Sequence, residues 1–275
     1  TILVSGDLKT GINVLRLIKV AGAVTFAGST QVTQLRTDGS ATYNLSLVGA
    51  SNSIATFYTS KPFETSGTLT LGDEATDTFT YSGGAFNPSR PAILSLSGTI
   101  VTSNVTAGNG AVTLGDASTA VTLGAGFTVN TSASNSDITI ASSATIAGAG
   151  KALTLNAGTG TISITSALSG MGNLTFTANE INWSATIAGT GTLSLKPTTA
   201  TNVINVGAAS DAGTSTLDIL ASEIALLGNT FSGVTIGGGL QSGNINIAGN
   251  STFTTPVTFT TSGKTVLSAN LSASG

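Results

Sequence analysis

A short alternating pattern recurs along most of the chain: an apolar residue, then Thr, Ser or Asn, then a second apolar residue. Residues 69–71 (LTL), 112–114 (VTL) and 138–140 (ITI) are examples. Because side chains alternate sides along a strand, each triplet predicts a short strand with its outer residues in a core and its polar residue outside. Gly or Asn commonly follows, as at Gly72 and Asn156, where a tight turn favours positive φ.

The spacing of the triplets indicates how the strands are assembled. Successive triplets start about 9 to 12 residues apart, with no helical segment long enough for a βαβ crossover. Such intervals are typical of β-sandwiches or of a β-solenoid. Strands this short, aromatic residues at 5% and many small residues favour the solenoid. The sequence therefore predicts an all-β chain in which residues 1–275 form a single continuous solenoid segment of roughly a dozen coils, each of about 20 to 24 residues.

Two segments depart from the triplet pattern. Residues 85–92 contain two of the five prolines, which cannot donate to a strand ladder, so we expect a loop protruding from the rod. Residues 217–228 (LDILASEIALLG) have apolar residues at helical spacing between Leu217 and Leu227. We expect a strand that runs into a single helical turn there.

Composition and charge exclude several classes of function. The chain is 40% hydrophobic with 8% charged residues and a mean hydropathy of +0.36, so it is expected to fold rather than to be disordered. Nine basic against 12 acidic residues leave no basic surface for nucleic acid. The most apolar stretch, residues 11–27, is interrupted by Arg16 and Lys19, so we expect no membrane span. The chain opens on Thr1 and ends within the repeat pattern, and we expect a piece of a longer protein.

The groups that usually carry out catalysis are scarce. There is no His and no Cys, which removes the commonest general base and the thiolate chemistry. Most carboxylates are isolated and lie beside Gly or Thr, where Asp closes turns. The full set is Asp7, Asp38, Glu64, Asp73, Glu74, Asp77, Asp116, Asp137, Glu180, Asp211, Asp218 and Glu223.

Only Asp73, Glu74 and Asp77 cluster along the sequence. They leave a calcium site open, although no EF-hand loop or glycine-rich nonapeptide repeat is present. We assign no catalytic, cofactor-binding or metal-binding residue, we expect no cofactor, and we do not expect an enzyme.

The triplets and the segments between them resemble the repeat regions of bacterial filamentous-haemagglutinin-like surface proteins, the giant adhesins of two-partner secretion systems. The resemblance lies in residues 65–84, 151–164, 172–195 and 215–239, most of all in the order NLTFTANEINW, IAGTGTLSL and LDILASEIALL. The resemblance implies a right-handed parallel β-helix, export through an outer-membrane transporter, and a role as a shaft or adhesive filament.

We therefore expect a structural or adhesive extracellular protein, secreted or held at the bacterial cell surface. Its expected partners are further copies, end to end or side by side, and a host cell, a neighbouring cell or a glycan. Two alternatives stay open: a carbohydrate-binding or carbohydrate-degrading β-helix, and a surface-layer lattice protein.

Overall fold

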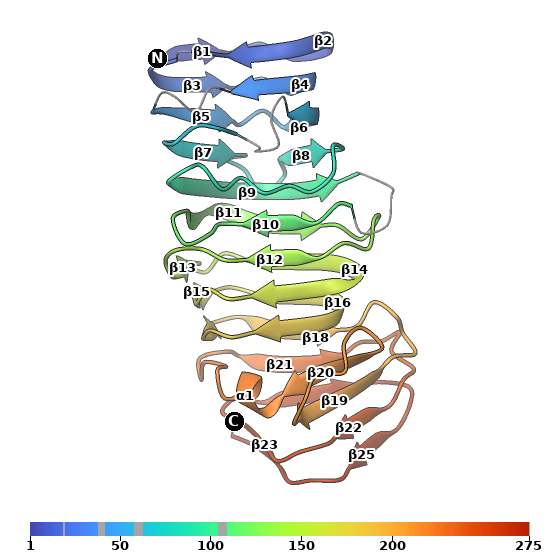
Figure 1. The fold of residues 1–275 in the computed structure, drawn as a ribbon. Helices are drawn as coiled ribbons and strands as arrows, with labels where there is room; N and C mark the ends of the chain where they lie inside the picture. Colours follow the sequence, from blue (N-terminus) through green and yellow to red (C-terminus); the bar gives the residue numbers. More distant parts are fainter. Residues whose placement is uncertain (19, 38–41, 58–62, 104–108, 275) are drawn as a thin grey trace.

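The computed structural model describes residues 1–18, 20–37, 42–57, 63–103 and 109–274. Parallel strands stack into a β-solenoid of about 12 turns, and the only described helix is α1 (Ala221–Ile224). Figure 1 shows the coils piled along one axis, with the N-terminus at one end of the rod and the C-terminus at the other. The predicted all-β solenoid is confirmed. None of the described helical residues forms a segment long and apolar enough to cross a membrane.

One parallel ladder runs nearly the whole length of the rod. Its strands, in order, are β2 (Leu8–Leu17), β4 (Thr30–Thr37), β6 (Ser51–Phe57), β8 (Thr78–Tyr81), β9 (Ile93–Thr102), β11 (Ala120–Asn130), β14 (Leu153–Ile164), β16 (Leu174–Trp183), β18 (Thr192–Lys196), β21 (Gly233–Gly237) and β24 (Val257–Thr260).

Two further ladders share the long strands, which turn a corner partway. The first contains β1 (Ile2–Val4), β3 (Gly22–Phe26), β5 (Tyr43–Leu47), β7 (Thr68–Leu71) and the first parts of β9 and β11. The second contains β10 (Val112–Leu114), β12 (Ile138–Ile140) and the second parts of β14 and β16. At the β9 corner Gly98 has φ +76°, and an added Cβ would lie 2.2 Å from the Asp77 carbonyl oxygen, so only Gly fits there.

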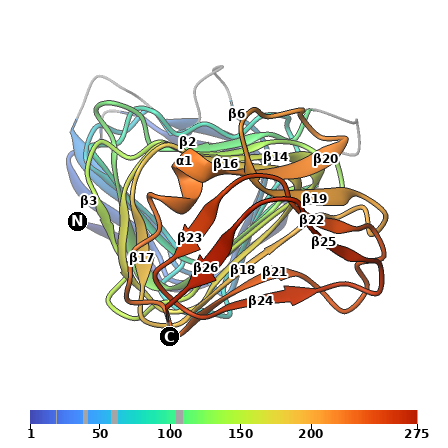
Figure 2. The same cartoon turned by 90° about the horizontal axis from the view of Figure 1, so that it is seen from below.

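Three shorter ladders complete the rod. They are β13 (Ile146–Ala147), β15 (Leu168–Met171) and β17 (Ile187–Gly189); then β20 (Thr216–Leu220), β19 (Val203–Ala208), β22 (Ile245–Ile247) and β25 (Thr265–Leu267); and finally β23 (Ser251–Phe253) with β26 (Leu271–Ala273). Seen along the rod in Figure 2, β18, β21 and β24 lie on one side of the lower coils, β19, β22 and β25 on the next, and β17 on a third.

The core is a stack of like side chains. Leu45 pairs in register with Leu69, and Leu69 with Leu94, and all three are 0% exposed. Within one triplet, Leu69 and Leu71 are buried while Thr70 between them is only half-buried. The alternation read from the sequence therefore gives both the short strands and their inward faces.

The segment 85–92, expected to protrude, lies against this core. It contains no strand apart from a single bridge between Phe86 and Val112, and the side chains of Phe86, Pro88 and Pro91 are buried. Phe86 packs against Phe79, with ring centroids 5.4 Å apart, and also contacts Phe57, Phe63 and Tyr81. Burial of this aromatic cluster offsets the ladder bonds that the prolines cannot make.

Coil length changes abruptly near the C-terminal end. In the regular part, residues that bond between neighbouring coils lie 19 to 28 positions apart along the chain, a wider range than the predicted 20 to 24. Across residues 197–232 the separation rises to between 39 and 42 positions. We call residues 197–232 the acidic coil, for the carboxylates described below, and strands β3 to β18 the regular stack.

The acidic coil places two strands where other coils place one. β18 pairs directly with β21, yet between them the chain forms β19, returns through residues 209–215, and forms β20 beside β19 and next to β16. Strand β20 then runs into α1, which is the helical turn expected within residues 217–228. Below β16, the side of the rod with β20, β19, β22 and β25 therefore has one strand more than the side with β18, β21 and β24 (Figures 1 and 2).

Candidate functional site: a buried carboxylate cluster

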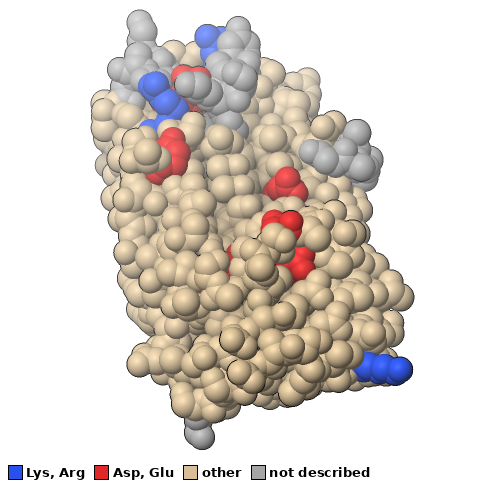
Figure 3. Space-filling view, turned by 60° about the horizontal axis from the view of Figure 1, so that its bottom comes forward, with Lys and Arg blue, Asp and Glu red and all other residues tan. Residues whose placement is uncertain are grey.

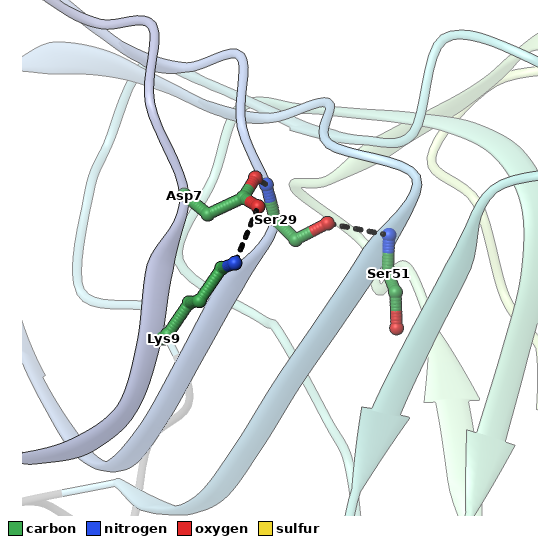
Figure 4. Close-up of polar contacts among 4 residues, drawn as sticks. All are labelled: Asp7, Lys9, Ser29 and Ser51. Atoms are coloured by element: carbon green, nitrogen blue, oxygen red, sulfur yellow. Dashed lines mark hydrogen bonds and ion pairs between the residues drawn. The ribbon is translucent and has the colours of Figure 1, made fainter.

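Turn carboxylates connect successive coils in the N-terminal and middle parts of the rod. Asp7 Oδ1 accepts the backbone N–H of Ser29 at 2.9 Å, and in the same way Asp137 Oδ1 accepts that of Thr161 at 2.8 Å. Figure 4 shows the first of these contacts continuing from Ser29 Oγ to the Ser51 N–H, with Lys9 Nζ 3.9 Å from Asp7 Oδ2. These carboxylates have a structural role in joining coils.

The cluster read from the sequence at Asp73, Glu74 and Asp77 is also a turn. Asp77 is buried, and its Oδ2 accepts the backbone N–H groups of Asp73 and Glu74 at 2.9 and 3.0 Å. Burial raises the pKa of Asp73, and the nearby charges of Asp77 and Glu74 add to this effect. These hydrogen bonds within the turn explain why the Asp77 carboxylate is buried.

A second carboxylate cluster forms where the acidic coil meets the regular stack. Glu180 comes from β16, Asp211 from the loop after β19, and Asp218 from β20, and one oxygen of each lies within 4.8 Å of the others. Of the His, Cys, Asp and Glu side chains that the structure describes, only these three gather in this way. Glu180 and Asp218 are each 2% exposed, whereas Asp211 is exposed.

The backbone explains why acidic groups are buried at this boundary. Opposite β20, the N–H groups of Ile181 and Trp183 on β16 donate to carboxylates instead of to carbonyl groups of a neighbouring strand. Ile181 donates to Glu180 Oε1 at 3.2 Å, and Trp183 donates to Glu223 Oε1 at 3.0 Å. A buried N–H without an acceptor is costly, so these carboxylates stabilise the interrupted ladder.

Hydrogen bonds from β16 and from β20 fix the position of Glu223. Its Oε2 accepts the N–H of Leu220 at 2.9 Å, and its backbone oxygen accepts the indole N–H of Trp183 at 2.8 Å. Burial raises the pKa of Glu223 to about 7; the hydrogen bonds from Leu220 and Trp183 oppose this rise. Both oxygens of this side chain are thus occupied by backbone donors.

Asp218 and Asp211 are also fully bonded. Asp218 accepts the side-chain amide N–H of Asn205 at 2.7 Å, the Ala212 N–H at 2.8 Å and the Thr216 hydroxyl at 2.9 Å. The amide of Asn246 in turn donates to Asn205 at 3.1 Å, which extends the network to the next coil. Asp211 accepts the Gly213 N–H through Oδ1 and the Asn182 amide through Oδ2.

Glu180 is different, because its Oε2 is buried and has no hydrogen-bond partner. Burial raises the pKa of Glu180 to about 8, and the charges of Asp211 and Asp218 add to the rise. Among the described residues, no Lys or Arg forms an ion pair with Glu180, Asp211, Asp218 or Glu223. In the face drawn in Figure 3, acidic groups gather near the middle of the molecule with no basic group beside them, and basic groups lie toward its two ends.

A groove of about 680 Å³ lies near the acidic coil but has different chemistry. Its lining consists of Ser132, Asn156, Thr177, Lys196, Pro197, Thr198, Ala200, Gly238, Gly239, Leu240 and Gln241. None of these residues is aromatic or acidic, so the groove offers neither a ring for stacking on a sugar nor a pair of carboxylates for cleaving a glycosidic bond.

Sequence reasoning missed the carboxylate cluster because Glu180 is far in the chain from its two partners. It lies 31 positions before Asp211 and 38 positions before Asp218. The available signal was the presence of Glu180 and Glu223 inside apolar segments, NEINW and SEIAL, in a chain with only 12 acidic residues. Acidic residues are seldom fully buried without a specific partner.

No protein-family model, curated protein or solved structure matches this chain.

Proposed function

We propose that the protein is a structural shaft or filament segment of a bacterial extracellular adhesin, secreted or held at the cell surface. The observation that carries this proposal is the unbroken parallel ladder from β2 to β24. A ladder of this length makes each coil depend on its neighbours and gives a stiff rod. The resemblance to filamentous-haemagglutinin-like repeats supports the same role and adds an outer-membrane transporter as a proposed partner.

Self-association end to end is the proposed way in which segments extend. Ile2 and Leu3 in β1 are 48% and 66% exposed, and Val266 and Leu267 in β25 are 39% and 65% exposed. These side chains lie in the last described strands of their ladders, where a further coil, of the same chain or of another copy, would cover them and pair with the strand edge. Adhesion to a cell or a glycan would then be multivalent along the filament.

Electron microscopy of the purified chain, with light scattering after size exclusion, tests this proposal. We expect rods that extend as concentration rises. Ile2→Lys and Leu267→Lys place a charge at inward positions of the two end strands and should shorten the rods to single segments. Leu240→Lys is the matched control, because Leu240 is 89% exposed but lines the lateral groove and should leave assembly unchanged. Monomers at every concentration would contradict the end-to-end proposal.

A carbohydrate-degrading β-helix is the second candidate, and the gathering of Glu180, Asp211 and Asp218 is the observation that favours it. It ranks second because Glu180 and Asp218 are buried, which keeps a polymeric substrate from reaching them. Release of reducing ends from bacterial or plant polysaccharides, lost in Glu180→Gln, would reverse this order.

A further inference from the structure

We propose that Glu180, Asp211 and Asp218 bind one hard divalent cation, of which Ca²⁺ fits best, at the junction between the regular stack and the acidic coil. This inference is independent of the shaft function proposed above.

The spacing of the oxygens suits a single ion. Ca²⁺ binds oxygen at about 2.3 to 2.6 Å, so two of its ligand atoms lie at most about 5 Å apart. One oxygen from each of the three carboxylates already lies within 4.8 Å of the others, which allows all three to contact one centre. Ca²⁺ accepts irregular sets of six to eight oxygens, and water entering beside the exposed Asp211 would complete the set.

The side chain of Glu180 provides a second observation that points to a bound ligand, independent of the spacing of the oxygens. Its side chain is 98% buried, since only 2% is exposed, and Oε2 lacks any hydrogen-bond donor. Glu180 Oε1 accepts only the N–H of the following residue, Ile181. A buried carboxylate oxygen without a donor is rare in a folded protein and requires a proton or a cation.

The charge balance points to a cation of charge two or more. Three carboxylates converge without an ion pair to any described Lys or Arg. The chain contains no His and no Cys, so the donor set consists of hard oxygens, which favours Ca²⁺ over Zn²⁺ or Cu²⁺. Asn205 and Thr216 hold Asp218 in place, so this ligand is oriented before the ion arrives.

Binding would join two parts of the fold that share little backbone pairing. Glu180 belongs to β16 and Asp218 to β20, and opposite this part of β16 side-chain carboxylates accept the backbone N–H groups. A shared ion would fasten the acidic coil to the coil above it. Ion binding to the folded state alone raises the unfolding temperature with ion concentration.

Titration calorimetry with CaCl₂ on the EDTA-treated chain near pH 7.5 tests the proposal, together with the melting temperature in CaCl₂ and in MgCl₂. We expect one Ca²⁺ per chain, weaker Mg²⁺ binding, and a melting temperature several degrees higher in Ca²⁺. Glu180→Gln should abolish the binding heat, and Asp211→Asn should weaken binding at least tenfold. Asp137→Asn removes one charge from an exposed turn of the regular stack and should bind Ca²⁺ normally.

A second readout reports on the place of binding. Tb³⁺ replaces Ca²⁺ at oxygen sites and emits when a nearby indole is excited. Trp183 is the only Trp and lies on the same strand as Glu180, so Tb³⁺ emission excited through Trp should appear in the wild type and vanish in Glu180→Gln. No binding heat and no change in melting temperature in a folded wild-type chain would overturn the proposal, since Glu180 then holds a proton instead. So would Ca²⁺ binding of equal strength in Glu180→Gln.

Discussion

The regular stack and the acidic coil provide hydrogen-bond acceptors for buried backbone N–H groups by different means. In the regular stack, the backbone of the next coil satisfies the strand edges, and similar apolar side chains such as Leu69 and Leu94 fill the interior. Where the acidic coil meets the regular stack, the extra strand interrupts that pairing, and Glu180 of β16 and Glu223 of α1 accept backbone N–H groups within the protein interior. In a repeated ladder the backbone of each coil satisfies the next, so the same short pattern is enough. Where the ladder is interrupted, specific polar side chains are needed to bond the buried backbone groups.

The comparison predicts first that a carboxylate is tolerated at the junction but not inside the regular stack. Leu94→Asp places an acid at a fully buried position between Leu69 and Val121. We expect a loss of more than about 5 kcal/mol in unfolding free energy, from the lost packing and the unpaired buried acid. Chemical denaturation followed by circular dichroism measures it. The control Ser95→Asp, at the next, outward position, should cost less than about 1 kcal/mol; equal losses would show that the side chain's direction does not matter.

The second prediction concerns pH and applies to the chain in EDTA. The pKa of Glu180 is raised to about 8 in the folded protein, from an ordinary value of 4.5. The folded state therefore binds this proton more tightly than the unfolded state, so the stabilisation is complete below about pH 4.5 and is lost as pH rises to about 8. We expect Glu180 to contribute a loss of roughly 3 to 5 kcal/mol over that range.

Urea unfolding at several pH values, with and without the Glu180→Gln change, measures this contribution. In the variant the neutral amide should remove most of the decline, so that it is the more stable protein at pH 8 and in EDTA. A decline of the same size in both proteins would assign the pH effect to other groups, of which Asp211, Asp218 and Glu223 are nearest.

The third prediction tests whether Glu223 replaces ladder carbonyls. Glu223→Ala leaves the N–H groups of Trp183 and Leu220 without their acceptors and should cost about 2 to 3 kcal/mol. Glu223→Gln keeps one acceptor oxygen and should cost about 1 kcal/mol. Trp183 fluorescence reports the unfolding directly, since it is the only Trp. Equal stability of the Ala variant and the wild type would mean that the interrupted ladder needs no acceptor here.

The smallest expected effect belongs to a turn of the regular stack. Burial acts to raise the pKa of Asp116, but hydrogen bonds from Ser118 and Thr119 outweigh it and lower the pKa. Its stabilisation is therefore present above the ordinary pKa of 3.8 and is lost as pH falls, which is opposite in sign to Glu180. Asp116→Ala should cost about 1 kcal/mol at pH 7 and less at pH 3, measured by thermal unfolding. A cost that grows as pH falls would contradict this assignment.

The repeat was predictable because it is local. The triplet at 69–71, with Gly72 after it, is enough to predict a strand, its inward face and the turn that follows. Neighbouring coils repeat the same pattern. The helical turn after Leu217 was readable for the same reason. The site was not, because Glu180 and Asp218 are brought together only by a strand that the chain inserts out of order. The position of segment 85–92 depended likewise on distant partners, since Phe86 is held by Phe57 and Phe79.

The extra strand of the acidic coil also has a consequence for shape. Adjacent strands are about 4.8 Å apart, so adding one strand to a single side of a rod acts as a wedge. The coils from β21 onward should incline toward the side with fewer strands, and Figure 1 shows the lower coils fanning away from the regular stack. A long fibre that contained several such wedges at fixed intervals would follow a curved or superhelical path instead of a straight line. Its curvature would be set by how often a coil of this kind occurs in the sequence.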